Sequence, residues 1–131
     1  MADEAVSVLV VDDQPPFRMA AKTVVRVTPG FEVVGEAESG EEAVTQVDEL
    51  HPDLVLMDIN MPGINGIEAA RRITTAHPDV CVILLSTYTA DDLPADALSS
   101  GAAAYINKDE FGPQVLQSTW NDGRGNLGKP A

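Results

Sequence analysis

Carboxylate side chains end two of the most apolar segments of this chain. Asp58 follows the apolar run 54–57 and opens a loop that contains Pro and Gly. Asp12 and Asp13 follow the apolar run 6–11 in the same way. An acidic side chain at the end of such an apolar run must be needed for function. If the two runs are neighbouring parallel strands, their polar last residues meet at one edge of a sheet.

Two further apolar runs end in polar groups of other kinds. Ser86 and Thr87 follow the run 82–85, and Lys108 lies just past the run 103–106. In an open parallel α/β sheet the active crevice lies beyond the carboxyl ends of the strands, where these groups would converge with the three carboxylates. Like charges packed together need a cation, and an all-oxygen site of modest size suits Mg²⁺.

This combination of groups suits phosphoryl transfer. The reaction demands mainly that the nucleophile be positioned in line and that charge on the phosphoryl oxygens be neutralised. Lys108 and Mg²⁺ facing an acidic side chain would provide a place for the phosphoryl group. Asp58 would then be the nucleophile and would accept the group as an acyl phosphate.

The elements that must position these side chains alternate between strands and helices. Most of the five strand-length runs are continuously apolar, which is typical of parallel strands covered on both faces. The predicted fold class is therefore α/β, with a doubly wound parallel sheet. The predicted strands are residues 6–11, 31–35, 54–57, 80–85 and 103–106.

Five helices are predicted between and after these strands, from helical spacing and end signals. The second has the clearest start, because Ser39 precedes Glu42 by three residues as in a capping box. His51 and His77 each precede Pro and are interpreted as C-terminal cap residues. The predicted helices run from Pro15 or Pro16 to about 28, from 39 to 51, from about 66 to 77, from 90 to 100, and from about 113 to 121.

Composition limits the classes of function. The chain has 131 residues, is 44% hydrophobic, and carries 21 acidic against 8 basic residues, a net charge of -13. We expect one folded domain over residues 1–122, with 123–131 as a flexible tail. The acidic charge argues against nucleic-acid binding, and no membrane segment or leader is apparent, so a cytoplasmic location is expected. The single Cys81 is interpreted as a buried small hydrophobe.

Four motifs in order resemble the receiver domain of bacterial two-component response regulators, over roughly residues 7–120. They are VLVVDDQ, DLVLMDINMPGINGIE, VILLSTY and GAAAYINK. The resemblance implies a flavodoxin-like fold with five parallel strands in the order 2-1-3-4-5, flanked by five helices. It is compatible with a stand-alone receiver or with the receiver part of a LuxR-type regulator.

The resemblance also implies roles for the acidic residues. Asp58 would be phosphorylated by a histidine kinase or phosphotransfer protein, or by a small acyl phosphate. Asp13, Asp58 and the backbone carbonyl of Asn60 would bind Mg²⁺, and Asp12 would reach the ion through water. The domain would slowly lose its own phosphoryl group and would not be a turnover enzyme.

Switching would follow from the remaining site residues. Ser86 and Lys108 would contact the phosphoryl oxygens, and Tyr105 would turn inward as the Ser86 hydroxyl shifts. Together these moves would bias the face formed by the helix 90–100, the strand 103–106 and the last helix. That face would bind an unknown downstream protein or a second copy of the chain.

Some positions depart from the commoner family pattern. Asp109 follows Lys108 where many receivers have a proline after a cis bond, although receivers of LuxR-type regulators often lack it. The switch hydroxyl is Ser86 instead of the frequent Thr, and Thr87 replaces a usual small residue.

Other interpretations remain open at the sequence level. Asp12 and Asp13 could merely cap the first helix, and Tyr105 could serve packing alone. A receiver-like module that works without phosphorylation is one alternative function. An aspartate-nucleophile phosphatase of the haloacid dehalogenase type is another, but it needs a second Asp where this chain has Asn60. A flavodoxin-type protein would want a Ser/Thr-rich loop in place of DDQPP.

Asn60 and Tyr88 occupy positions that influence loss of the phosphoryl group in the family. A ring at Tyr88 would hinder the attacking water, so we expect an acyl phosphate of moderate to long life. Replacing Tyr88 with Ala should speed dephosphorylation, measured as decay of the phosphorylated mass. Unchanged decay would count against this role of the ring.

Overall fold

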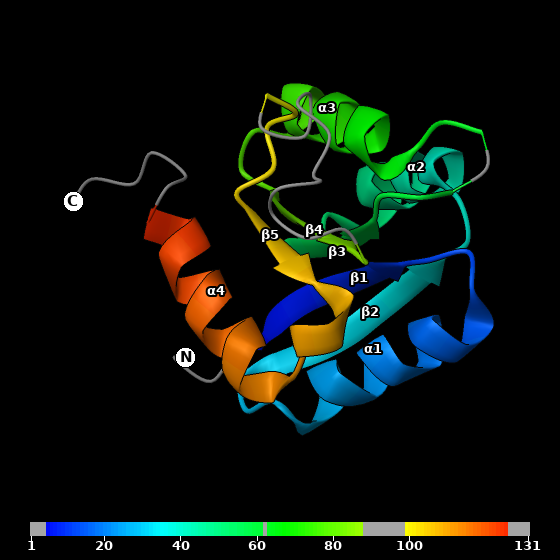
Figure 1. The fold of residues 1–131 in the computed structure, drawn as a ribbon. Coiled ribbons are helices and arrows are strands. Elements are labelled where there is room, and N and C mark those ends of the chain that lie inside the picture. Colours follow the sequence, from blue (N-terminus) through cyan, green and yellow to red (C-terminus); the bar gives the residue numbers. More distant parts are fainter. Residues whose placement is uncertain (1–4, 62, 88–98, 126–131) are drawn as a thin grey trace.

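The computed structural model describes residues 5–61, 63–87 and 99–125, and it confirms the predicted parallel sheet (Figure 1). The five strands are all paired in parallel, in the order β2-β1-β3-β4-β5. This is the order expected of a flavodoxin-like fold. Their bounds are β1 Val6–Val11, β2 Phe31–Ala37, β3 Leu54–Asp58, β4 Cys81–Ser86 and β5 Ala104–Asn107.

The helices cover both faces of the sheet. In Figure 1, α1 and α4 lie on one face, and α2 and α3 lie on the other. Every residue of β3 and β4 is consequently buried, which explains why these two strands are continuously apolar. The bounds are α1 Pro15–Val27, α2 Gly40–Leu50, α3 Gly66–Ala76 and α4 Pro113–Gly125.

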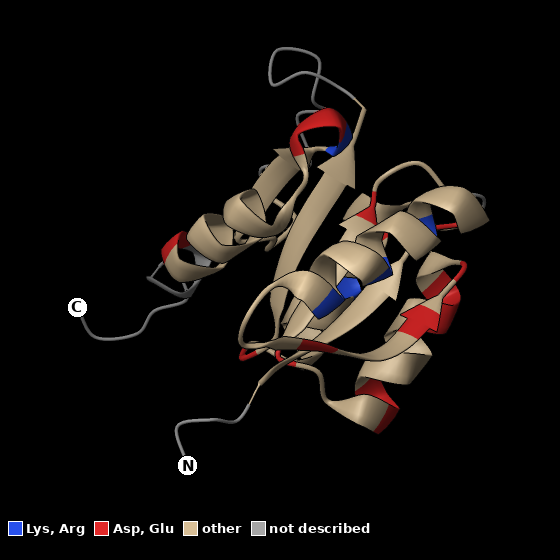
Figure 2. Cartoon of the chain, turned by 90° about the horizontal axis from the view of Figure 1, so that it is seen from below, with Lys and Arg blue, Asp and Glu red and all other residues tan. Residues whose placement is uncertain are grey.

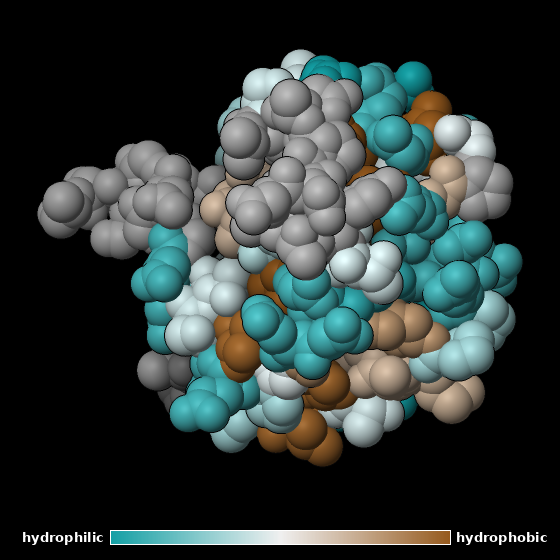
Figure 3. All heavy atoms as spheres, viewed as in Figure 1, coloured by the Kyte–Doolittle hydropathy of each residue, from teal (hydrophilic) through white to brown (hydrophobic). Residues whose placement is uncertain are grey.

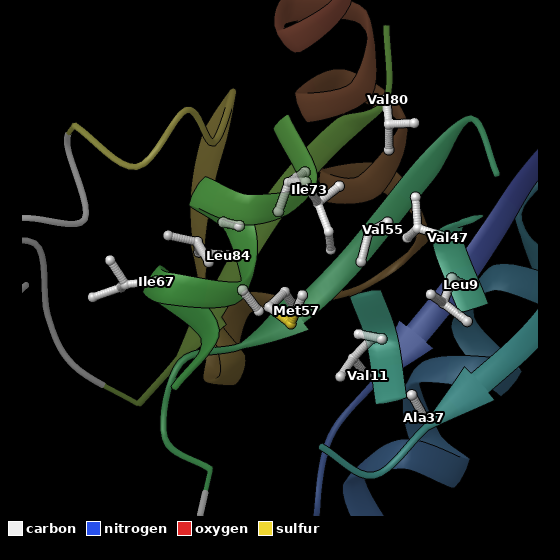
Figure 4. Packing of buried hydrophobic residues seen from close by; sticks show 14 of the residues in the cluster. Leu9, Val11, Ala37, Val47, Val55, Met57, Ile67, Ile73, Val80 and Leu84 are labelled. Carbon is white, nitrogen blue, oxygen red and sulfur yellow. The ribbon is translucent and has the colours of Figure 1, made fainter. Parts of the chain in front are cut away.

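Two hydrophobic clusters hold the layers together. Figure 4 shows the first, in which Val55 and Leu84 of the sheet meet Val47 of α2 and Ile73 of α3. The second cluster joins the opposite face of the sheet to α1 and α4. There Trp120 of α4 packs edge-on against Phe31, with ring centroids 6.2 Å apart. Cys81 is buried in this second cluster, as predicted, and burial raises the pKa of its thiol to about 11.

The helix ends follow local hydrogen bonding. The Ser39 hydroxyl accepts from the backbone N–H of Glu42, as the capping box predicts, while the Glu42 carboxylate accepts from the N–H of Glu38. Asn65 caps α3 by accepting from the N–H of Glu68. The helix was predicted to start at about residue 66, but the Asn65 cap was not predicted.

Both predicted C-terminal cap histidines are confirmed. His51 ends α2 in the left-handed conformation, at φ 48°, and His77 ends α3. Their rings lie edge-to-face with centroids 5.6 Å apart, and His77 Nε2 is 2.6 Å from the Asp48 carboxylate. These contacts join the ends of α2 and α3.

The structure differs from the expected elements in a few places. Most of the helix predicted at 90–100 lies outside the described residues, so the described part of the chain has four α-helices where five were expected. The last helix, expected to end near 121, continues to Gly125. β2 extends beyond Gly35 to Ala37, because Ala37 is still in register with Val11 across an irregularity in the pairing.

The described surface is acidic and has no large apolar area in the views shown. Acidic residues are spread over the ribbon in Figure 2, and basic residues are fewer. In Figure 3 the hydrophobic residues form small separate areas between hydrophilic ones. No helix within the described ranges is both long enough and apolar enough to cross a membrane.

Gly66, the first residue of α3, allows this helix to approach the end of β3. Its N–H donates to the Ile59 carbonyl at 2.9 Å, and a Cβ at this position would lie 2.0 Å from the Asp58 carbonyl oxygen. We therefore expect Gly66→Ala to lower the free energy of unfolding by at least about 2 kcal/mol in urea titrations, because the backbone must move.

Gly112→Ala is the matched control, because a Cβ at Gly112 would meet nothing within 4 Å. It should change the stability by well under about 1 kcal/mol. Equal stabilities of the two variants would show that the close approach of Gly66 to β3 does not constrain the residue type.

Candidate functional site

The predicted site residues come together at the carboxyl edge of the sheet because the strands are in register there. Val11 pairs with Met57, so Asp12 follows β1 next to the end of β3. Ser86, the last residue of β4, pairs with Asn107, so Lys108 follows β5 beside it. The parallel sheet thus brings together side chains from four strand ends.

Three carboxylates form a compact group at this edge. One oxygen from each of Asp12, Asp13 and Asp58 lies within 4.8 Å of the others. Asp12 is 1% exposed and Asp58 is 3% exposed, while Asp13 is half-buried. Such a set of hard oxygen donors, partly open to solvent, fits a divalent cation of the Mg²⁺ type that keeps some of its waters.

Lys108 provides the compensating positive charge. Its Nζ lies 2.9 Å from Asp12 Oδ2 and 3.1 Å from Asp58 Oδ1. Burial opposes the ammonium charge, but the hydrogen bond with Asp12 and the nearby carboxylates outweigh it and raise the pKa of Lys108 above its usual range. Lys108 therefore stays charged at neutral pH.

An aromatic contact that the sequence analysis missed also fixes Lys108. The Nζ lies 4.3 Å from the centre of the Phe17 ring, and that ring packs against Phe111. A ring face attracts a cation, so Phe17 helps to hold the ammonium over the site. No local signal in the sequence relates Phe17 to a lysine 91 positions away.

The carboxyl group of Asp58 has an unusual proton affinity. Burial, and next the negative charge of Asp12, raise its pKa to about 6, against the opposing effects of Lys108 and a hydrogen bond from the Asn60 backbone. The ionised form is thus costly here unless further positive charge is supplied. A cation bound next to Asp58 would supply that positive charge.

Asp12 also organises the start of α1. Its carboxylate accepts from the N–H of Gln14 at 2.8 Å, and its backbone carbonyl accepts from the Arg18 guanidinium at 2.8 Å. The helix-capping interpretation is wrong for Asp12, because Gln14 is the N-cap of α1 and no side chain caps the helix there. It does not account for the contact with Lys108 or for the closeness to Asp58.

Ser86 and Tyr105 lie together beside the carboxylates. Ser86 is fully buried and Tyr105 is half-buried, packed against the cluster on the α2 and α3 side. Burial raises the pKa of the Tyr105 hydroxyl, while a side-chain hydrogen bond with Ser86 acts in the opposite direction. The Tyr105 hydroxyl is thus linked to Ser86, the predicted switch residue.

The remaining predicted residues are less enclosed. Asn60 is exposed in the loop after β3, where its backbone bonds to the Asp58 carboxyl group. Thr87 is exposed at the end of β4. Tyr88 lies outside the described residues. Asp109 belongs to the 3-10 turn Lys108–Glu110, which begins at the site lysine.

This arrangement defines a class of protein, and the comparisons agree with it. The chain belongs to the response regulator receiver domain family, whose model matches residues 8–120. Receiver domains of response regulators are signalling modules. The fold and the acidic site described above are therefore those of a two-component signalling domain.

The curated relatives include response regulators and a transcriptional regulatory protein. The response regulator GacA of Pseudomonas viridiflava is 43% identical over 113 residues, covering 86% of this chain and 53% of that protein. The response regulator UvrY of Escherichia coli strain K12 is 39% identical, covering 86% and 52%. The transcriptional regulatory protein DegU of Brevibacillus brevis is 38% identical, covering 88% and 49%. The chain thus spans about half the length of these relatives.

Two solved structures illustrate the similarity of fold. The response regulator domain of Thermotoga maritima CheB superposes with a TM-score of 0.78 at 34% identity, covering 98% of this chain and all of that chain. A chain of the Borrelia burgdorferi CheX–CheY–BeF3–Mg²⁺ complex gives a TM-score of 0.77 at 31% identity, covering 90% and 89%.

The raised pKa of Asp58 predicts a pH-dependent cost in stability. Since the folded-state pKa of about 6 exceeds the ordinary 3.8, the ionised carboxylate destabilises the metal-free fold above pH 6, and this cost disappears as the pH falls through 6 toward 4. Asp58→Asn should therefore stabilise the metal-free protein by up to about 3 kcal/mol near pH 7.5 and by clearly less near pH 5, in urea titrations.

Asp79→Asn, at an exposed position before β4, is the control and should change little at either pH. A stability gain for Asp58→Asn that is the same at both pH values would contradict the electrostatic explanation.

Proposed function

We propose that the chain is a phosphorylation-controlled switch in which Asp58 accepts a phosphoryl group from the phosphohistidine of a kinase or phosphotransfer protein, or from a small acyl phosphate. The observation that carries this proposal is the buried Asp58 carboxylate held between one ammonium and two further carboxylates. A structural ion pair would need Lys108 and one carboxylate only. Three carboxylates around one lysine leave a deficit of positive charge that a divalent cation can fill.

The transfer itself requires little chemistry from the protein. A carboxylate oxygen of Asp58 forms a bond to phosphorus as the bond from phosphorus to the donor nitrogen breaks, and the leaving imidazole keeps the electron pair and takes up a proton. Lys108, fixed by Phe17, neutralises charge on the phosphoryl oxygens. The buried position of Asp58 limits access of water to the acyl phosphate.

The acidic group fits a magnesium ion in kind and number of donors. We assign Asp13, Asp58 and the backbone carbonyl of Asn60 as ligands, with Asp12 reaching the ion through water. When bound, the ion would add positive charge next to the phosphoryl oxygens. Its binding would also lower the cost of ionising Asp58 at neutral pH, because the pKa of about 6 reflects burial and like charge.

The signal would leave the site through Ser86 and Tyr105. A phosphoryl group on Asp58 offers new acceptor oxygens to the Ser86 hydroxyl, which is buried at the end of the neighbouring strand β4. Movement of Ser86 changes the partner of the Tyr105 hydroxyl. Since Tyr105 lies in the edge strand β5, its position bears on that edge of the sheet, where a partner protein would bind.

Slow loss of the group, and not turnover of a substrate, fits these residues. Asn60 stands where an aspartate-nucleophile phosphatase needs a second carboxylate, and it is exposed. An amide cannot act as a general acid or base as a carboxyl group can. The switch is accordingly favoured over the phosphatase.

The direct test is intact mass measurement after incubation with phosphoramidate or a small acyl phosphate and Mg²⁺. The wild type should gain one phosphoryl group. Asp58→Ala should gain none, and the exposed control Asp79→Ala should behave as the wild type. Chelation of Mg²⁺ should slow the gain by at least about 100-fold, since the ion neutralises developing charge.

No gain with any donor or kinase would favour the module that works without phosphorylation. Gain of the group at another residue would show that Asp58 is not the acceptor. Amide chemical shifts of Ser86 and Tyr105, recorded with and without phosphorylation, report the switch. Shifts that stay unchanged at both residues would contradict the proposed output route.

A further inference from the structure

Arg18, in the first turns of α1, connects the acidic loop to the neighbouring edge strand. Its side chain is only 13% exposed. The Nη1 donates to the Asp12 backbone carbonyl at 2.8 Å, and the Nε donates to Glu36 Oε1 of β2 at 2.8 Å. The Nη2 lies 3.8 Å from Glu38, just past the end of β2. One guanidinium thus joins the loop after β1 to the end of β2.

The carbonyl that Arg18 holds belongs to the peptide that joins Asp12 to Asp13. On the other side of Asp12, its N–H donates to the Ala37 carbonyl at 3.1 Å. Asp12 is therefore tied to β2 twice, once directly and once through Arg18 and Glu36. The orientation of the following peptide limits where the Asp13 carboxylate can lie, since only the φ dihedral of Asp13 and its side-chain torsions separate them.

We propose that Arg18 is a positioning residue, which fixes the peptide between Asp12 and Asp13 and so aims the half-buried Asp13 carboxylate at the cation position. Asp13 is the least enclosed member of the acidic group. The assignment rests on the proposed function in one respect only, namely that a cation binds there. The contact between Arg18 and the loop stands without it.

Arginine suits this role because of its planar fork. Separate N–H groups of one rigid guanidinium can serve a carbonyl and a carboxylate at the same time, whereas an ammonium is a point charge on a flexible stem. Hydrogen bonds from Lys22 and Arg18 lower the pKa of Glu36, so its carboxylate is ionised at neutral pH. Glu36 is thereby a stable anchor for the fork.

The chain itself provides a matched control. Lys22 Nζ contacts the same carboxylate, Glu36, at 2.8 Å, and its side chain is nearly as enclosed, at 17% exposed. Lys22 lies one helical turn after Arg18, and none of its described bonds reaches Asp12. Loss of Lys22 therefore removes an ion pair of the same kind without releasing the acidic loop.

The first arm of the experiment uses metal-free protein. Hydrogen exchange of the Asp12 and Gln14 amides, both bonded at this loop, is followed by NMR. Arg18→Met should speed their exchange about tenfold relative to the core amides of β3, because the loop opens more readily. Lys22→Met should leave both rates near those of the wild type.

The second arm measures Mg²⁺ binding by calorimetry. Arg18→Met should weaken the affinity about tenfold, the lower end of what outer groups around metal ligands contribute. Arg18→Lys should stay weak, because one nitrogen would replace the separate Nη1 and Nε that serve the carbonyl and Glu36. Lys22→Met should bind as the wild type does. Saturating Mg²⁺ should restore the phosphorylation rate of Arg18→Met, which separates a metal-binding defect from a general one.

The inference would be overturned if both Arg18 variants showed the exchange rates and the Mg²⁺ affinity of the wild type. The proposed function would still stand in that case, because the wild type would still bind Mg²⁺ and be phosphorylated at Asp58. Equal effects of Lys22→Met and Arg18→Met would also overturn it, because any ion pair to Glu36 would then suffice. If the wild type binds no Mg²⁺, the proposed metal site fails, and the exchange arm still decides whether Arg18 holds the loop. If Arg18→Met does not fold, Arg18→Lys is judged on the same readouts.

Discussion

The shortage of positive charge at the carboxyl edge of the sheet is the constraint on which the rest of the structure depends. Asp12, Asp13 and Asp58 bring three carboxylates within 4.8 Å, and Lys108 is bonded to two of them. With all four groups ionised, the site carries three negative charges against one positive. Burial and the charge of Asp12 raise the pKa of Asp58 to about 6, because the positive charge present is too small to offset them. A divalent cation would supply the missing charge, and in the proposed function a phosphoryl group would react with Asp58 next to Lys108.

The fold serves this edge by making it rigid. Parallel pairing places the strand ends in register, and two hydrophobic clusters on opposite faces keep β3 and β4 from shifting. Around the site the backbone is held by individual contacts: Gly66 allows α3 to reach the end of β3, and Arg18 ties the loop after β1 to β2. A rigid frame matters because, in the proposed function, a misplaced carboxylate would lose both its cation and its approach to phosphorus.

Against this frame, Ser86 and Tyr105 are suited to change. Ser86 is buried at the end of a central strand, whereas Tyr105 is half-buried in the edge strand β5. A side chain in an edge strand can reorient without disturbing pairing on both sides. The relatives of this chain are response regulators that it matches over about half of their length, and their family identifies the domain as a signalling module. The route from Asp58 to β5 would be the physical basis of the signal.

The sequence by itself determined the strands, their parallel arrangement and the cap at Ser39. It also determined that Asp12, Asp13, Asp58 and Lys108 follow the ends of strands. Apolar runs, local caps and strand-end residues are all properties of neighbouring positions in the chain. Most residues of the helix predicted at 90–100 lie outside those described. Only the tertiary structure decided four features of the site. They are the pKa of Asp58, the contact of Lys108 with the Phe17 ring, the hydrogen bond from Arg18 to the Asp12 carbonyl, and the close approach of Gly66 to β3. Each of these depends on distances between segments that are remote or differently oriented in the chain, as with Lys108 and Asp12, which are 96 positions apart and 2.9 Å from each other. Local patterns carry no such distances, so only the folded chain could supply them.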